Sequence, residues 1–134
     1  MDGYEEGTDA FRYKFHDEKK TWQEAKRKCG MEGANLAMIK SKETREYVET
    51  KYVSPDMWIG LSDLRQEGEF EFLDGSQPDA STTTSWWPGQ PSGGTRYNCV
   101  ETNFNGKPGR WNDDSCSAKY KFLCQKSKSG LVWE

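Results

Sequence analysis

Four cysteines and a single histidine, His16, carry the most reactive side chains in this sequence. Structural zinc sites and redox dithiols are built on thiolates at close paired spacing such as Cys-x-x-Cys, which this sequence lacks. An even number of cysteines without that spacing is typical of structural disulfides in an oxidising compartment. The sequence therefore predicts a secreted or extracellular protein. The cysteines are Cys29, Cys99, Cys116 and Cys124.

Four cysteines permit three disulfide pairings. Cys99 and Cys116 flank a segment rich in Asn, Gly and Pro, and such a turn-forming segment favours a local bond between them. That bond leaves Cys29 to pair with Cys124, which closes a long loop between the start and the end of the chain. In the chain-entropy model, loops of these two lengths stabilise the fold by about 3 and about 4–5 kcal/mol.

Residues that could support catalysis do not form a recognisable constellation. No nucleophile pattern accompanies His16, and a single histidine limits triad chemistry. Asp113 and Asp114 are adjacent, and adjacent side chains on an extended segment point to opposite faces, so they do not form a glycosidase pair. We therefore expect a binding protein and not an enzyme.

Composition indicates a globular domain. The 134 residues carry a formal net charge of −3, with 31% charged, 33% hydrophobic and 13% aromatic side chains, and large aromatic rings supply buried area. We expect a single domain over residues 1–134, with a core at about 11–125 and a short tail at 126–134. The balanced charge does not favour nucleic acid as a partner. No segment approaches the ~20 apolar residues of a membrane span, and residues 1–9 are too polar for a signal peptide.

The pattern of apolar residues predicts two helices followed by short strands. Thr21 and Glu24 form a capping-box pattern that begins the first helix. Its apolar stripe holds Trp22, Ala25 and Cys29. This order predicts an α+β fold with a small irregular antiparallel sheet. The expected elements are a strand at 11–15, a helix from about 21 that ends near Gly30 or Gly33, a helix at about 41–52, and strands at 57–61, 69–72, 99–102, 110–112 and 120–124.

The segment from 75 to 97 has no periodicity and is rich in Pro, Gly, Ser and Thr. A loop of this length inside a compact domain is usually either functional or disordered. Trp86 and Trp87 lie within it, which favours an ordered, functional loop. We expect Trp86 to anchor the loop, and Trp87 and Tyr97 to form an exposed aromatic platform.

Three motifs and the four cysteines occur together in a recognisable order. The motifs are Trp58-Ile59-Gly60-Leu61, Trp86 followed by Gly89-Gln90-Pro91-Ser92, and Trp111-Asn112-Asp113. In order and spacing the chain resembles a C-type lectin-like domain from about Phe11 to Gln125, in the short form without an additional N-terminal cysteine pair. The resemblance implies a double-loop fold whose long loop, about Ser62 to Asn98, carries the ligand site. It also implies the bonds Cys29–Cys124 and Cys99–Cys116, which agrees with the local argument.

The resemblance implies a calcium-dependent carbohydrate-binding lectin, with innate recognition as its expected setting. Sugar-binding relatives hold Ca²⁺ through the residues flanking a cis-proline, an acid further on, and the Asn-Asp pair after Trp. Ca²⁺ takes six to eight oxygen ligands, and sugar hydroxyls can complete its shell. The corresponding residues here are Gln90, Ser92, Tyr97, Asn112 and Asp113. A second, weaker calcium site of the family corresponds to Asp63, Glu67 and Asn98.

Ligand preference and calcium affinity follow from individual positions. Gln90 resembles the Gln of galactose-type relatives, so a galactose-type glycan is favoured, and its C–H face would stack on Tyr97 or Trp87. Ser92 replaces Asn or Asp, and Tyr97 replaces an acid, so Asp113 brings the only full negative charge. We therefore expect weak calcium binding, with a Kd of about 10⁻⁴–10⁻³ M.

Ser92 and Tyr97 also support an alternative in which a calcium-independent domain binds a protein or another ligand through the long loop. Homodimerisation is a further expectation, because a weak single site gains avidity in a multimer. The apolar tail Gly130-Leu131-Val132-Trp133 could supply the interface.

Overall fold

The computed structural model describes residues 2–53, 55–78, 85–86, 88–91 and 97–129. Within these ranges two α-helices and a short 3-10 helix accompany an eight-stranded sheet. The elements are β1 (Glu5–Glu6), β2 (Phe11–Lys20), α1 (Trp22–Met31), β3 (Asn35–Leu36), α2 (Lys42–Lys51), β4 (Met57–Ser62), β5 (Glu71–Phe72), β6 (Cys99–Thr102), η2 (Phe104–Gly106), β7 (Asn112–Asp114) and β8 (Tyr120–Ser127).

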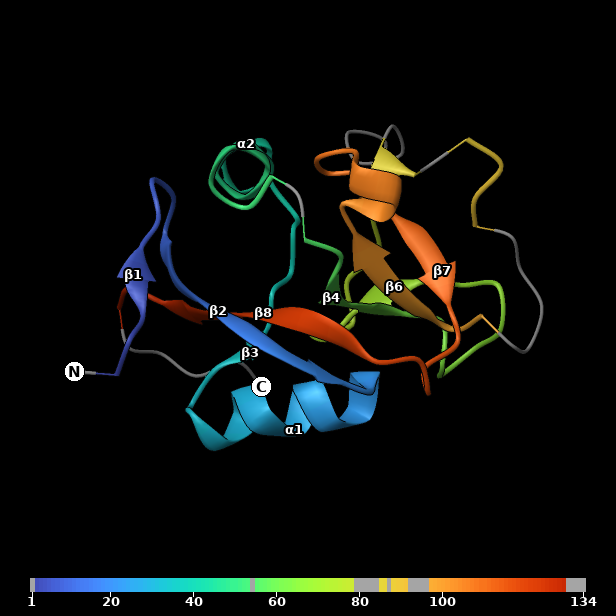
Figure 1. Ribbon diagram of the computed structural model, residues 1–134, viewed down its shortest axis with the longest axis horizontal. Helices are drawn as coiled ribbons and strands as arrows, with labels where there is room; N and C mark the ends of the chain where they lie inside the picture. Colours follow the sequence, from blue (N-terminus) through green and yellow to red (C-terminus); the bar gives the residue numbers. More distant parts are fainter. Residues whose placement is uncertain (1, 54, 79–84, 87, 92–96, 130–134) are drawn as a thin grey trace.

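The strands follow the order β1-β2-β8-β4-β6-β7, with β3 also paired to β8 and β5 to β4. Only the β4–β8 pair among the described strands is parallel, so the sheet is mixed and not wholly antiparallel as expected. Figure 1 shows α1 and α2 on opposite sides of the long β2–β8 pair, with β6 and β7 at the far end from β1. The predicted α+β fold with two helices is confirmed.

Both helices begin where capping side chains are present. Thr21 accepts a hydrogen bond from the Glu24 amide at 3.3 Å, and the Glu24 carboxylate accepts one from the Thr21 amide at 3.0 Å, which completes the predicted capping box. The stripe of α1 that faces the sheet is also the predicted one. Helix α2 begins at Lys42, directly after its N-cap Ser41, whose hydroxyl accepts a hydrogen bond from the Thr44 amide. No helix in the described ranges is long and apolar enough to cross a membrane.

The core consists of two clusters of buried side chains. One lies between α2 and the sheet and includes Ile59 and Trp111. The other lies against α1 and includes Trp58 and the Cys29–Cys124 disulfide, whose Cα atoms are 5.5 Å apart. The second disulfide, Cys99–Cys116, joins the start of β6 to the segment after β7.

Five strands differ from their predicted ranges, and two of them, β4 and β8, only continue further, to Ser62 and Ser127. β2 continues to Lys20 although residues 16–20 are polar, because its backbone pairs with β8 across an irregularity between His16 and Lys20. β5 keeps only residues 71–72, and β7 covers residues 112–114. Backbone pairing with a neighbouring strand determines where these strands end, and the pattern of side chains in the sequence does not indicate that pairing.

Candidate functional site

The β6–β7 hairpin positions the Asn-Asp pair that follows Trp111. Asn112 lies opposite Glu101 and Asp113 lies opposite Val100 in the antiparallel register. Both side chains are nearly buried, with 7% of Asn112 and 3% of Asp113 exposed. The Cys99–Cys116 disulfide closes this hairpin, so the two polar residues sit on a covalently fixed support.

Aromatic packing holds the long loop beside β7. The Trp111 amide donates to the Ser85 carbonyl at 2.6 Å, and the rings of Trp86 and Trp111 pack edge to face with centroids 5.5 Å apart. Trp86 also packs edge to face with Phe70. The expected anchoring role of Trp86 thus has a structural basis.

The loop then reaches Gln90, and the Gln90–Pro91 peptide bond is cis, as the resemblance implies. The side-chain oxygen of Gln90 is buried and accepts no hydrogen bond from the part of the chain that the structure describes. Ser92 and Trp87 lie outside the described residues. Tyr97, directly after that gap, is 40% exposed.

Carboxylates from two parts of the chain meet beside the hairpin. Asp63 is only 2% exposed, and its amide donates to the Asn98 carbonyl at 3.0 Å, which brings the second set of predicted calcium ligands together. One oxygen of Asp63 accepts from the Gly68 amide at 2.8 Å, whereas the other is buried without a hydrogen-bond partner. Partial desolvation raises the pKa of Glu67, and the nearby negative charges of Asp63 and Asp113 raise it further.

These observations fit a hard cation. Buried oxygens that accept no hydrogen bond are unfavourable, because each has lost its water without gaining a partner. Asp63 Oδ1 and Gln90 Oε1 are two such oxygens, and carboxylate and amide oxygens are the ligands that Ca²⁺ takes. The negative charges of Asp63 and Asp113 contribute to the raised pKa of Glu67, so three acidic side chains lie near one another here.

Behind Asn112 lies the buried carboxyl group of Glu101, a residue that the sequence suggests only as a substitute for the missing acidic ligands. Glu101 is fully buried, and its Oε2 accepts a long hydrogen bond of 3.4 Å from the Asn112 side-chain amide. Burial, followed by the neighbouring Asp56 and Asp114 carboxyls, raises the pKa of Glu101 to about 10. Asp114 in turn accepts a hydrogen bond from the Tyr120 hydroxyl. With its amide nitrogen directed at Glu101, Asn112 keeps its carbonyl oxygen for another partner.

Sequence patterns contain only part of the information needed to predict that Glu101 and Asp56 lie together in a buried acidic cluster. Glu101 lies in a short strand whose four residues are all buried. Because apolar and polar residues do not alternate there, the sequence does not indicate that Glu101 is buried. Asp56 precedes β4 by one residue, and no spacing in the sequence links it to Glu101. Their proximity follows from the pairing of β4 with β6.

Comparison with known proteins identifies the family. Residues 18–126 match the Lectin C-type domain family. C-type lectin domain family 4 member F of Mus musculus is 34% identical over 121 residues, which cover 86% of this chain and 21% of the relative. The chain spans 8–44% of the length of such curated relatives.

Solved structures agree with the sequence match. The human scavenger receptor C-type lectin carbohydrate-recognition domain has a TM-score of 0.82 at 29% identity, covering 94% of this chain and 97% of that one. A Ca²⁺-dependent type II antifreeze protein in its Ca²⁺-free form has a TM-score of 0.80 at 27% identity, covering 93% and 98%. The fold therefore accompanies both sugar-binding and antifreeze proteins. With its two disulfides and two helices in place, this chain belongs to the C-type lectin domain family.

Proposed function

We propose that the domain is a calcium-dependent lectin that binds a galactose-type glycan outside the cell. The observation that carries the proposal is the pair of buried, unpartnered oxygens on Gln90 and Asp63, in a region where Asp63, Glu67 and Asp113 approach one another. Such oxygens are stabilised when a cation takes the place of the missing donors.

Gln90, Ser92, Asn112 and Asp113 are the residues that would hold the principal Ca²⁺, and Asp63, Glu67 and Asn98 would hold a weaker one. The bound ion would accept two vicinal sugar hydroxyls as ligands. Glu101 fixes the rotation of the Asn112 amide, because its carboxyl oxygen accepts from the amide nitrogen. Asp113 supplies the negative charge from a rigid strand.

Two further features support a sugar ligand of the galactose type. Gln90 occupies the position that is associated with galactose binding in the family. Tyr97 is exposed and adjoins Asn98, so its ring is available to stack on the apolar C–H face of galactose. Trp87 would add a second aromatic contact.

The site carries few charges, so we expect a calcium Kd of about 10⁻⁴–10⁻³ M, a range typical of extracellular modules. A single weak sugar site binds multivalent glycans usefully only when several copies act together, so homodimerisation is part of the proposal. Analytical ultracentrifugation at micromolar protein tests the dimer; sedimentation as a monomer at all concentrations would reject it.

Isothermal titration of the oxidised chain with Ca²⁺, then with galactose, tests the site. We expect calcium heat that is abolished by EDTA, and galactose heat only in the presence of calcium. Asp113→Asn is expected to lower calcium affinity at least about tenfold, the effect of losing about 1.4 kcal/mol of binding energy. Asp17→Asn removes the same charge from a side chain that is 79% exposed and is the matched control. No heat from either ligand would reject the proposal.

A second candidate is a calcium-independent domain that binds protein through the same loop. The observation that favours it is Tyr97, an exposed, uncharged side chain where the family has an acid. The antifreeze structures match this fold as well as the lectin domains do. A glycan array with and without EDTA separates the two candidates: EDTA-sensitive galactoside signals support the lectin, whereas a partner that is retained by Asp113→Ala supports the second.

A further inference from the structure

An open cleft lies where helix α2, the long loop and the loop between β6 and β7 meet. It has a volume of about 220 Å³, and most of its lining is polar. We call this surface the arginine cleft, and its lining residues are Arg45, Glu49, Ser85, Pro108, Gly109 and Arg110. A guanidinium group presents a planar fork of donors that matches the oxygens of a carboxylate or of a phosphate-like anion. The two arginines therefore make the cleft a candidate site for an anion.

Packing holds the acidic side chain of the cleft against the opposite wall. A Cβ atom at Gly109 would lie 2.6 Å from Cδ of Glu49, so this carboxyl group is packed directly against the β6–β7 loop. Arg45 Nε lies 3.7 Å from Glu49 Oε2, which is too long for a hydrogen bond. Only 22% of the Arg45 side chain is exposed. Helix α2 thus presents Arg45 to the cleft from a partly buried position, where water and salt screen its charge less than at the surface.

The charged side chains that line the cleft have a positive total. Partial burial raises the pKa of Glu49, whereas the charges of Arg45 and Arg110 lower it. Both guanidinium groups therefore lie close enough to act on the same carboxyl group. With Glu49 ionised, the three charged side chains of the lining carry +1, and protonation of Glu49 increases this to +2. An anion is attracted to the cleft in either state.

The cleft adjoins the strand that carries Asn112 and Asp113. Two residues of chain span at most roughly 7 Å, so the Cα atoms of Arg110 and Asn112 lie no further apart than that. The Trp111 amide donates to the Ser85 carbonyl at 2.6 Å, which ties the loop wall of the cleft to the start of this strand. A glycan held at Asn112 and Asp113 would therefore extend a neighbouring substituent toward Arg110.

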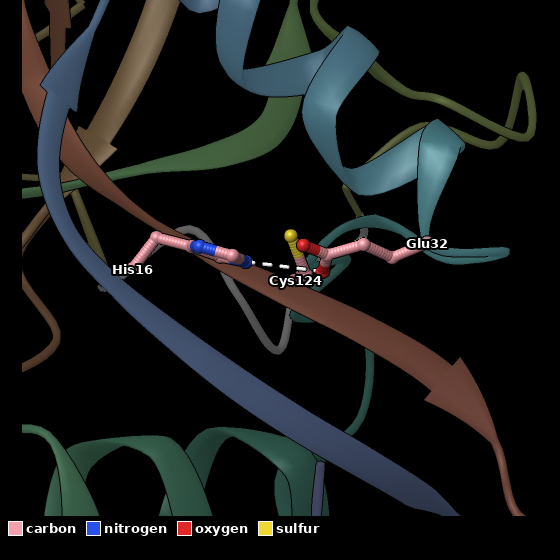
Figure 2. A group of neighbouring side chains, drawn as sticks. All are labelled: His16, Glu32 and Cys124. Atoms are coloured by element: carbon pink, nitrogen blue, oxygen red, sulfur yellow. Dashed lines mark hydrogen bonds and ion pairs between the residues drawn. The ribbon is translucent and has the colours of Figure 1, made fainter. Parts of the chain in front are cut away.

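A contrasting polar group lies between β2, α1 and β8, where Figure 2 shows His16, Glu32 and Cys124 close together. Glu32 Oε1 accepts a hydrogen bond from the Tyr4 hydroxyl at 2.7 Å and lies 3.1 Å from His16 Nε2. The sulfur of Cys124 is bonded to Cys29. Contacts inside the fold account for these side chains, so this group carries no ligand site. The arginine cleft differs because it opens to solvent between three elements.

We propose that the arginine cleft binds the anionic group of an acidic galactoside, a sulfate or a carboxylate, through Arg45 and Arg110. This inference rests on the proposed function, because the calcium site would hold the galactose ring while the cleft holds its charged substituent. The anion forms hydrogen bonds and ion pairs with the two guanidinium groups and undergoes no covalent change. Linking two weak contacts in one ligand raises the affinity for acidic galactosides above that for neutral ones.

Inorganic sulfate in EDTA tests the cleft separately from the calcium site. The ¹⁵N-labelled chain is titrated with sodium sulfate at constant ionic strength, and we expect saturable shifts of the Arg45 and Arg110 resonances. Arg110→Gln should weaken sulfate binding at least about tenfold, the effect of losing about 1.4 kcal/mol of binding energy. Glu49→Gln should strengthen it, because an acid is removed from the lining, and loss of folding cannot explain opposite effects. Arg27→Gln replaces an exposed arginine of α1 and is the matched control. Shifts that do not saturate would overturn the proposal.

Isothermal titration in calcium compares a neutral methyl galactoside with its monosulfates and with a sialylated galactoside. We expect at least one anionic galactoside to bind about tenfold more tightly than the neutral one, and the ligand that gains identifies sulfate or carboxylate as the anion. Arg110→Gln should remove this gain and leave binding of the neutral galactoside unchanged. Equal affinities for neutral and anionic galactosides contradict this inference but not the proposed function. If the neutral galactoside does not bind, the proposed function fails, whereas saturable sulfate binding would still identify the cleft as an anion site.

Discussion

Glu101 occupies an unusual position for an acid, since it is fully buried and surrounded by other acids. Its neighbours Asp56 and Asp114 raise its pKa further, and the Asn112 side-chain amide donates a hydrogen bond to it. A carboxyl group in this setting retains its proton at neutral pH, because an ionised one would be a buried, unpaired charge. A neutral glutamine therefore resembles the protonated side chain of Glu101 more closely than an ionised glutamate does.

We predict that Glu101→Gln stabilises the calcium-free protein increasingly as pH rises. The folded-state pKa of Glu101 is about 10, and the unfolded-state value is about 4.3. Between these values the folded chain keeps a proton that the unfolded chain has released, so the free energy of unfolding falls by up to about 1.4 kcal/mol per pH unit. Glutamine has no proton to lose. Urea unfolding in EDTA at pH 4, 6 and 8 should show curves that agree at pH 4 and diverge by pH 8.

The control for this prediction is Glu69→Gln, which replaces an exposed glutamate. Its pH profile should follow that of the natural protein. Parallel profiles for Glu101→Gln and the natural protein would mean that Glu101 is ionised in the fold.

Among the elements, β4 depends most on a close backbone approach. Gly60 lies on β4, and its amide donates to the Ala37 carbonyl at 2.8 Å. A Cβ atom at Gly60 would lie 2.6 Å from the carbonyl oxygen of Leu36, on β3. Because that contact involves backbone and not a flexible side chain, a methyl group could be accommodated only by moving β3 or β4.

Gly60→Ala is therefore predicted to lower the free energy of unfolding by about 1–3 kcal/mol, as overpacking does. Gly30→Ala is the matched substitution. Gly30 is helical in α1 and a Cβ there meets no atom within 4 Å, so this change should stabilise the fold by about 0.5–1 kcal/mol. Thermal and urea unfolding of both variants measure the difference. If Gly60→Ala were as stable as Gly30→Ala, the approach of β3 to β4 would be looser than the structure has it.

The capping residues and apolar stripes allowed both helices to be predicted, because these signals are local. Strands were harder: β1 and β3 have two residues each, and polar β2 residues 16–20 pair only because β8 lies alongside. Whether such segments form strands depends on pairing with distant parts of the chain, and no periodicity in the sequence indicates that pairing. For the site, the resemblance supplied Gln90, Asn112 and Asp113, whereas the contact between Glu101 and Asn112 required the β6–β7 register.

Two disulfides constrain the chain over very different distances. Cys29–Cys124 spans 95 positions and joins α1 to β8, and both cysteines belong to the buried apolar cluster against α1. Cys99–Cys116 spans 17 positions and closes the hairpin that carries Asn112 and Asp113. The first should therefore act mainly on the stability of the fold, and the second mainly on the shape of the calcium site.

We predict that removing each of the two disulfides affects the free energy of unfolding and the calcium affinity to different extents. Replacing Cys29 and Cys124 by Ala should lower the free energy of unfolding by about 4–5 kcal/mol, against about 3 kcal/mol for Cys99 and Cys116, because the longer loop restricts the unfolded chain more. Calcium affinity should show the reverse order, since only the shorter bond fixes the strand that presents Asp113. Urea unfolding in EDTA and calcium titration of the same samples measure both quantities. A larger loss of calcium affinity in the Cys29 and Cys124 variant would show that the site is held by the whole sheet, and that its hairpin needs no covalent closure.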